Sequence, residues 1–129
     1  MAKKILIVED DVFLQGLAAT KLQKEGFDVL VAGDSDDATK ILESNVPDLF
    51  ILDIILPGAT DGLGILKKIR ENMKTINTPV IMFSNMSDEV NIKRAKELGA
   101  NEFMIKSNFT LDELAEKIKD ILNMKAGTA

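Results

Sequence analysis

Aliphatic residues in this chain form short, nearly continuous runs that are separated by segments of helical periodicity. Such runs occupy 4–8, 28–31, 49–52, 80–83 and 102–105. Runs without a polar alternation are typical of strands covered on both faces, and strands that alternate with helices favour βαβ units. The pattern therefore predicts an α/β fold with a doubly wound, five-stranded parallel sheet.

We expect five helices, beginning after Asp11, near Ser35 or Asp36, after Gly62, at Ser87 and at Thr110. Their sheet-facing residues are predicted to be Leu14, Leu17, Ala18 and Leu22 in the first helix, Ala38, Ile41 and Leu42 in the second, Leu63, Leu66 and Ile69 in the third, and Leu114, Ile118, Ile121 and Leu122 in the fifth. The first helix should end at Gly26, and Thr110 with Glu113 predicts a capping box. The fourth helix, 87–98, offers only Val90, Ala95 and Leu98 on a face with little aliphatic bulk. Weak anchoring of this kind is typical of elements that switch.

Length and composition narrow the function. The 129 residues suit one domain, and the net charge of −5 without a basic cluster argues against nucleic-acid contact. The sequence has no cysteine and no histidine, which excludes disulfides, thiolate ligands and imidazole chemistry, so a bound metal must have oxygen ligands. There is no signal-like start and no apolar stretch of membrane length. We expect a cytoplasmic protein without membrane contact.

Carboxylates stand at the ends of two of the predicted strands. Asp53 interrupts an aliphatic run that continues to Leu56, and Glu9, Asp10 and Asp11 follow the first run. Carboxyl ends of parallel strands meet at one edge of a sheet, where open α/β sheets bind ligands. Two carboxylates about 4 Å apart repel by roughly 4 kcal/mol at an effective dielectric of 20, so a crowded acidic edge needs a cation. Mg²⁺ suits such a site, because it is a hard ion that prefers oxygen ligands.

Each candidate also has a purely structural interpretation. Asp11 is better explained as a helix cap than as a metal ligand, whereas Glu9 is harder to explain as a cap. Asp53 could end a strand in a turn, but aliphatic residues rather than turn formers follow it. Ser84 could be a core hydroxyl and Lys106 a solvated lysine.

Taken together, these features resemble the receiver domain of two-component response regulators, the chemotaxis-type regulator fold. The matching stretches are 5–11, 47–53, 56–58 with Asp61 and Gly62, Ser84, 98–100 and 103–106. The resemblance implies a flavodoxin-like (βα)5 fold with strand order 2-1-3-4-5. It also implies a receiver domain over 1–124, followed by a tail or the start of a linker over 125–129.

By this resemblance, Asp53 is the phosphoacceptor. Mg²⁺, or alternatively Mn²⁺, would be bound by Glu9, Asp10, Asp53 and the backbone carbonyl of Ile55. Lys106 would be the phosphoryl clamp, Ser84 the switch hydroxyl and Phe103 the switch aromatic, although Phe103 is explained equally well as core packing.

The implied function is to accept a phosphoryl group from a histidine kinase or a histidine phosphotransfer protein. Phosphorylation would then change a surface formed by the fourth helix, the fifth strand and the fifth helix, toward a downstream target. No turnover of an external substrate is expected, beyond slow loss of the chain's own phosphoryl group. The protein would be a monomer or a phosphorylation-dependent dimer.

Three other functions compete with this one. A flavin carrier is disfavoured by the acids after the first strand, and a phosphohydrolase by Ile55 at the position of its second acid. A receiver-like docking module that works without phosphorylation remains as the alternative. Its support lies in departures from the family pattern: Ser107 stands where proline is usual, and the turn 57–62 is one residue longer than is common. Asn85 replaces a small residue after the switch hydroxyl.

Overall fold

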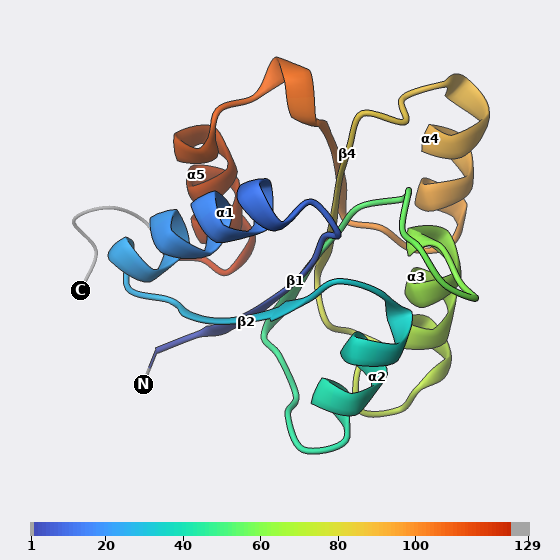
Figure 1. Ribbon diagram of the computed structural model, residues 1–129, viewed down its shortest axis with the longest axis horizontal. Coiled ribbons are helices and arrows are strands. Elements are labelled where there is room, and N and C mark those ends of the chain that lie inside the picture. Colours follow the sequence, from blue (N-terminus) through green and yellow to red (C-terminus); the bar gives the residue numbers. More distant parts are fainter. Residues whose placement is uncertain (1, 125–129) are drawn as a thin grey trace.

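The computed structural model describes residues 2–124, and its centre is a parallel sheet of five strands in the order β2-β1-β3-β4-β5 (Figure 1). The strands are β1 (Lys4–Val8), β2 (Asp28–Ala32), β3 (Leu49–Leu52), β4 (Val80–Ser84) and β5 (Glu102–Ile105). Both the fold class and the strand order are as predicted. β1 and β3 pair in parallel with Val8 opposite Leu52, so the residues that follow them emerge at one edge.

Helices cover both faces of the sheet. They are α1 (Val12–Lys24), α2 (Ser35–Leu42), α3 (Gly62–Glu71), α4 (Glu89–Glu97) and α5 (Leu111–Ile121). In Figure 1, α1 and α5 lie on one side of the sheet and α2, α3 and α4 on the other. Alternate residues of each strand enter the two cores, because successive side chains of a strand point to opposite faces. Ile5 and Ile7 of β1 pack with α1 and α5, whereas Leu6 and Val8 pack toward α2 and α3.

Local signals set most helix ends. Asp11 caps α1 through Oδ1, which accepts hydrogen bonds from the backbone N–H groups of Phe13 and Leu14. Thr110 and Glu113 form the predicted capping box of α5. Gly26 follows α1 with a φ of 95°, a left-handed conformation that glycine adopts without strain.

Some boundaries and one core assignment were wrong. α4 begins at Glu89 rather than Ser87, since Asp88 accepts a hydrogen bond from the Asn91 N–H and caps the helix there. Leu17 was predicted to face the sheet but is 45% exposed. It lies about 100° around the helix from the buried Ala18, which takes it off the inward face. A short 3₁₀ turn, η1 (Lys106–Asn108), was not predicted.

Two further features concern the chain as a whole. Within residues 2–124 the helices are all too short or too polar to span a membrane. The expected tail at 125–129 lies outside the described residues.

Candidate functional site

The acidic residues that follow β1 and β3 meet at the carboxyl edge of the sheet. The Glu9 backbone N–H donates to the Ala32 carbonyl at 2.9 Å, and the Asp53 N–H donates to the Val8 carbonyl at 3.1 Å. These bonds continue the β2–β1 and β1–β3 pairing one step past the strands. The backbone positions of both acids are therefore fixed by the sheet.

Glu9, Asp10 and Asp53 form one carboxylate cluster. Each offers an oxygen that lies within 4.8 Å of those of the other two. Asp53 is only 7% exposed and Glu9 only 4%, whereas Asp10 faces solvent. Two buried carboxylates beside a third require a positive charge, since unpaired charges inside a protein are costly.

Lys106 supplies one positive charge to this cluster. Its Nζ lies 2.6 Å from Asp53 Oδ2 and 2.5 Å from Glu9 Oε1. The lysine follows β5, which lies two strands away from β3 in the sheet. Lys106 therefore bridges the two buried acids, and its role as the phosphoryl clamp stays a prediction.

The pKa values of this group reflect burial and pairing. Burial raises the pKa of the Glu9 carboxyl above its ordinary value, although the hydrogen bond from Lys106 acts in the opposite direction. Burial by itself would lower the pKa of the Lys106 ammonium, but its bonds to Asp53 and Glu9 raise it. Lys106 is thus held in its charged form, the form that can bind an anion.

Ser84 ends β4 at the same edge and is fully buried. Its Oγ accepts a hydrogen bond from the Met86 N–H at 3.1 Å. The hydroxyl proton is the donor that Ser84 could offer to an arriving ligand. The edge thus combines three carboxylates, one ammonium and one hydroxyl. Such a set can bind an anion together with a divalent cation.

The family model of the response regulator receiver domain matches residues 5–119, almost the whole chain. This chain belongs to the response regulator receiver domain family. Receiver domains are signalling modules of two-component systems rather than enzymes that turn over an external substrate.

A curated relative of this chain is a regulatory protein from Bacillus subtilis. The chain is 34% identical over 122 residues to the alkaline phosphatase synthesis transcriptional regulatory protein PhoP of Bacillus subtilis, covering 95% of this chain and 49% of that protein. The chain thus spans about half the length of this curated relative.

Two solved structures show the same fold. A CheY-like receiver domain protein from Methanospirillum hungatei is 27% identical with a TM-score of 0.88, covering 95% of each chain. The Mn²⁺-bound form of the response regulator Rcp1 is 25% identical with a TM-score of 0.82, covering 98% of this chain and 97% of that one.

The donor set of this receiver domain fits a hard divalent cation. The three clustered side chains offer only carboxylate oxygens, the ligands that Mg²⁺ and Mn²⁺ prefer. The predicted fourth ligand, the Ile55 carbonyl, stays a prediction. The Ile55 N–H donates to Asp53 Oδ1 at 3.3 Å, so the backbone after Asp53 folds back on its carboxylate.

Two residues that the sequence pattern did not assign to the site hold its backbone in place. The Gln15 side-chain amide donates to the Glu9 carbonyl at 2.9 Å and to the Ala32 carbonyl at 3.3 Å. Gly62 begins α3 directly against β3, and a Cβ there would overlap the Asp53 carbonyl. Gln15 carried no recognisable signal in the sequence, whereas Gly62 belonged to the quoted family motif without an assigned role.

Phe103 lies on β5, apart from the carboxylate cluster. It is partly buried and lines a hollow beneath α4 with Ile92 and Ala95. The structure therefore places this side chain between the sheet and α4, and its role as a switch stays a prediction.

Two of the three departures from the family pattern, Ser107 and Asn85, lie beside Lys106 and Ser84 in the chain. No cis peptide occurs in the described part of the chain, so the bond between Lys106 and Ser107 is trans. The Ser107 N–H donates to Asn85 Oδ1 at 3.0 Å. Ser107 and Asn85, two departures from the family pattern, are thus hydrogen-bonded to each other.

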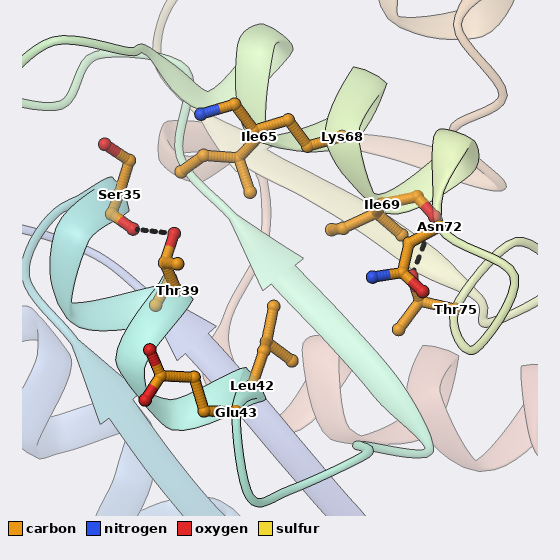
Figure 2. A pocket seen from close by; sticks show the side chains of 10 residues that line it. Ser35, Thr39, Leu42, Glu43, Ile65, Lys68, Ile69, Asn72 and Thr75 are labelled. Atoms are coloured by element: carbon orange, nitrogen blue, oxygen red, sulfur yellow. Dashed lines mark hydrogen bonds between the residues drawn. The ribbon is translucent and has the colours of Figure 1, made fainter.

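A larger hollow lies elsewhere. A cavity of about 360 Å³ opens between α2 and α3, and Figure 2 shows Leu42, Ile65 and Ile69 around it. Thr39 and Thr75 in its wall donate to the carbonyls of Ser35 and Ile69, both at 2.8 Å. None of the clustered acids lines this hollow, and the hydroxyls of Thr39 and Thr75 are already bonded within the chain. The carboxylate cluster at the sheet edge is therefore taken as the candidate site.

Proposed function

We propose that this receiver domain accepts a phosphoryl group on Asp53 in the presence of Mg²⁺ or Mn²⁺. The observation that supports this best is the placement of Asp53 between an acid cluster and an ammonium. Its carboxylate is nearly buried, lies beside Glu9 and Asp10, and contacts Lys106 Nζ at 2.6 Å. Burying these charged groups lowers stability, and few structural roles account for it. Phosphoryl transfer, in contrast, requires charges placed in this way.

In this proposal Glu9, Asp10, Asp53 and the Ile55 carbonyl hold the divalent ion. When bound, the ion supplies positive charge that offsets the phosphoryl oxygens. An oxygen of the Asp53 carboxylate forms the new bond to phosphorus as the bond from phosphorus to the donor's histidine nitrogen breaks. The nitrogen of that histidine keeps the electron pair.

Lys106 and Ser84 then contact the transferred group. Once Asp53 carries the phosphoryl group, the Lys106 ammonium exchanges its contact with the Asp53 carboxylate for a phosphoryl oxygen. The Ser84 hydroxyl donates to another oxygen. Neither residue changes its charge, so both act by placing positive charge and a donor where negative charge accumulates.

The 129 residues contain no histidine, so a phosphohistidine donor would lie outside them. A histidine kinase or a histidine phosphotransfer protein, acting in the cytoplasm, fits the family. The response would pass through the surface of α4, β5 and α5 to a downstream target. The chain spans about half of its PhoP relative, so the activity of any longer protein is part of the same proposal.

Labelling with a small phosphoryl donor tests this function. Acetyl phosphate should label the wild-type protein on Asp53 only with Mg²⁺ present, and Asp53→Asn should take no label. Asp36→Asn, which changes an exposed acid on α2, is the matched control and should label normally. Intact-protein mass spectrometry with acid quenching reads the result.

Two outcomes contradict the proposal. Equal labelling of Asp53→Asn would show that another residue accepts the group. A wild-type protein that takes no label with Mg²⁺ would instead favour the docking module that works without phosphorylation.

A further inference from the structure

Two loops at the acidic edge are joined by one side-chain hydrogen bond. Asn85 directly follows Ser84, and Ser107 directly follows Lys106. The paired part of β4 and β5 ends with Ser84 opposite Ile105. Beyond that point, Asn85 Oδ1 accepts the Ser107 N–H at 3.0 Å. The bond therefore continues the connection between the two chain segments past the end of the sheet.

This bond needs a side-chain acceptor at position 85 and any residue other than proline at position 107. Proline at 107 would have no N–H to donate, and a small apolar residue at 85 would have no acceptor. Both side chains are exposed, so burial does not explain the pairing. The two departures from the family pattern, Asn85 and Ser107, are thus hydrogen-bond partners.

The bond also lies next to the two groups that would contact a phosphoryl group. On one segment Ser84 is fully buried at the edge, and on the other Lys106 reaches Asp53 and Glu9. Ser107 is the first residue after Lys106 and lies within the 3₁₀ turn η1. A constraint on the Ser107 backbone therefore limits where the Lys106 backbone can lie, and its Nζ depends on that position.

We infer that Asn85 is a positioning residue, which holds the Lys106 loop for phosphoryl transfer through the Ser107 N–H. This inference rests on the proposed function. It adds a residue that would not touch the phosphoryl group itself but would act through Lys106. Asn85 replaces, with a side chain, the constraint that a proline ring would provide at 107. It also ties the loop of Ser84 to the loop of Lys106, so that the two phosphoryl contacts keep a fixed relation.

Substitutions at the two positions separate this role from a general structural one. Asn85→Ala removes the acceptor and should slow acetyl phosphate labelling about fivefold, the effect of one hydrogen bond. The Mg²⁺ affinity, followed by NMR titration, should stay unchanged because the metal ligands are on other loops. Ser107→Ala retains the N–H and is the control, with labelling at the wild-type rate.

Amide exchange reports the bond itself. The Ser107 amide should exchange faster in Asn85→Ala than in the wild type. Asn85→Asp retains an acceptor oxygen at the same place, so it should restore the protection of Ser107. This measurement needs no phosphorylation, and loss of protection in Asn85→Asp as large as in Asn85→Ala would count against the bond.

A double-mutant cycle provides the decisive comparison. In a Ser107→Pro background the N–H is gone, so Asn85→Ala should change the labelling rate no further. An equal slowing by Asn85→Ala in both backgrounds, or none in the wild-type background, would overturn the inference while the proposed function stands. Should Ser107→Pro fail to fold, the exchange of the Ser107 amide in the Asn85 variants decides the question. Absence of any labelling of the wild type would instead overturn the proposed function.

Discussion

The two faces of the sheet are held in different ways. On the face of α1 and α5, the two helices contact each other as well as the sheet. Lys21 pairs with Asp112, and Lys119 lies 2.5 Å from Glu25. Helix α5 buries Leu114, Ala115 and Ile118.

The opposite face includes a helix with very little anchorage. Ala95 is the single fully buried residue of α4, and Val90 is 73% exposed. The carboxyl end of α4 is held better, because Arg70 of α3 donates to the Gly99 carbonyl through Nε at 3.1 Å and Nη2 at 2.9 Å. Its amino end, which follows the Ser84 loop, lacks a comparable contact among the described residues.

Because the helices are anchored differently, a local structural change should spread more readily to one face than to the other. Moving α5 would cost a large apolar area and the ion pairs made by Asp112, Lys117 and Lys119, whereas moving the amino end of α4 costs little apolar contact. Ser84 ends the strand that precedes α4 along the chain, and Phe103 lines the hollow beneath this helix. A change at the acidic edge is therefore expected to reach α4 before it reaches α1 or α5.

The largest contrast is expected from truncations in the two helices. Ile118→Ala should destabilise the protein by about 2–5 kcal/mol, since it leaves a cavity in the core beneath α5. Val90→Ala on α4 should cost less than about 0.5 kcal/mol, because its side chain is mostly exposed. Urea unfolding followed by circular dichroism measures both. Equal losses would refute the view that the two helices are anchored differently.

Two helical glycines give the next largest contrast. In Gly62→Ala the new methyl group overlaps the Asp53 carbonyl, so α3 or the strand must move, at a cost of about 1–3 kcal/mol. A methyl group added at Gly16 of α1 would meet no atom within 4 Å, so Gly16→Ala should stabilise by up to about 1 kcal/mol. Thermal unfolding distinguishes the two. A harmless Gly62→Ala would show that the close approach of α3 to Asp53 is not needed.

Phosphorylation should affect the two faces differently. With beryllofluoride and Mg²⁺ as a phosphoryl mimic, we expect amide exchange in α4 to change about tenfold, a free-energy difference of about 1.4 kcal/mol. Amides of α1 and α5 that face each other should change much less. Exchange followed by mass spectrometry in peptides tests this. Unchanged exchange between Ser84 and Lys106 would argue against the switch.

The smallest effect is expected at the pair of Glu25 with Lys119. The hydrogen bond from Lys119 lowers the pKa of Glu25 below its ordinary value. The contribution of Glu25 to stability is therefore present above that ordinary pKa and is lost as the pH falls through the lowered one. Glu25→Gln should thus lower Tm slightly at pH 7, by less in high salt, and not at all in strong acid.

Glu71→Gln, an exposed acid on α3, is the control for this last comparison. Its Tm should follow that of the wild type at each pH. A Glu25→Gln difference that persists unchanged in strong acid would show that packing, rather than charge, links α1 to α5.

Features that depend on neighbours along the chain could be predicted from the order of the amino acids. Continuous aliphatic runs specify buried parallel strands, and their spacing with helices specifies the (βα)5 order. Asp11, Thr110 and Glu113 act on helix ends within three residues of themselves, so their roles as caps could be predicted. The meeting of Glu9, Asp10 and Asp53 followed from topology, because parallel strands bring their carboxyl ends to one edge.

Features that depend on distances between loops and on helix rotation could not be predicted in this way, because they arise only when the elements pack. The contact of Lys106 with Asp53 joins residues 53 positions apart, and that of Asn85 with Ser107 joins residues 22 apart. Leu17 has the right residue type for a core, but the tilt and rotation of α1 leave it outside. Periodicity shows which face of a helix is apolar, whereas the exact packing of that face depends on all its neighbours. The role of Gly62 could not be predicted for the same reason. A side chain is excluded there only because α3 packs directly against the backbone that follows β3.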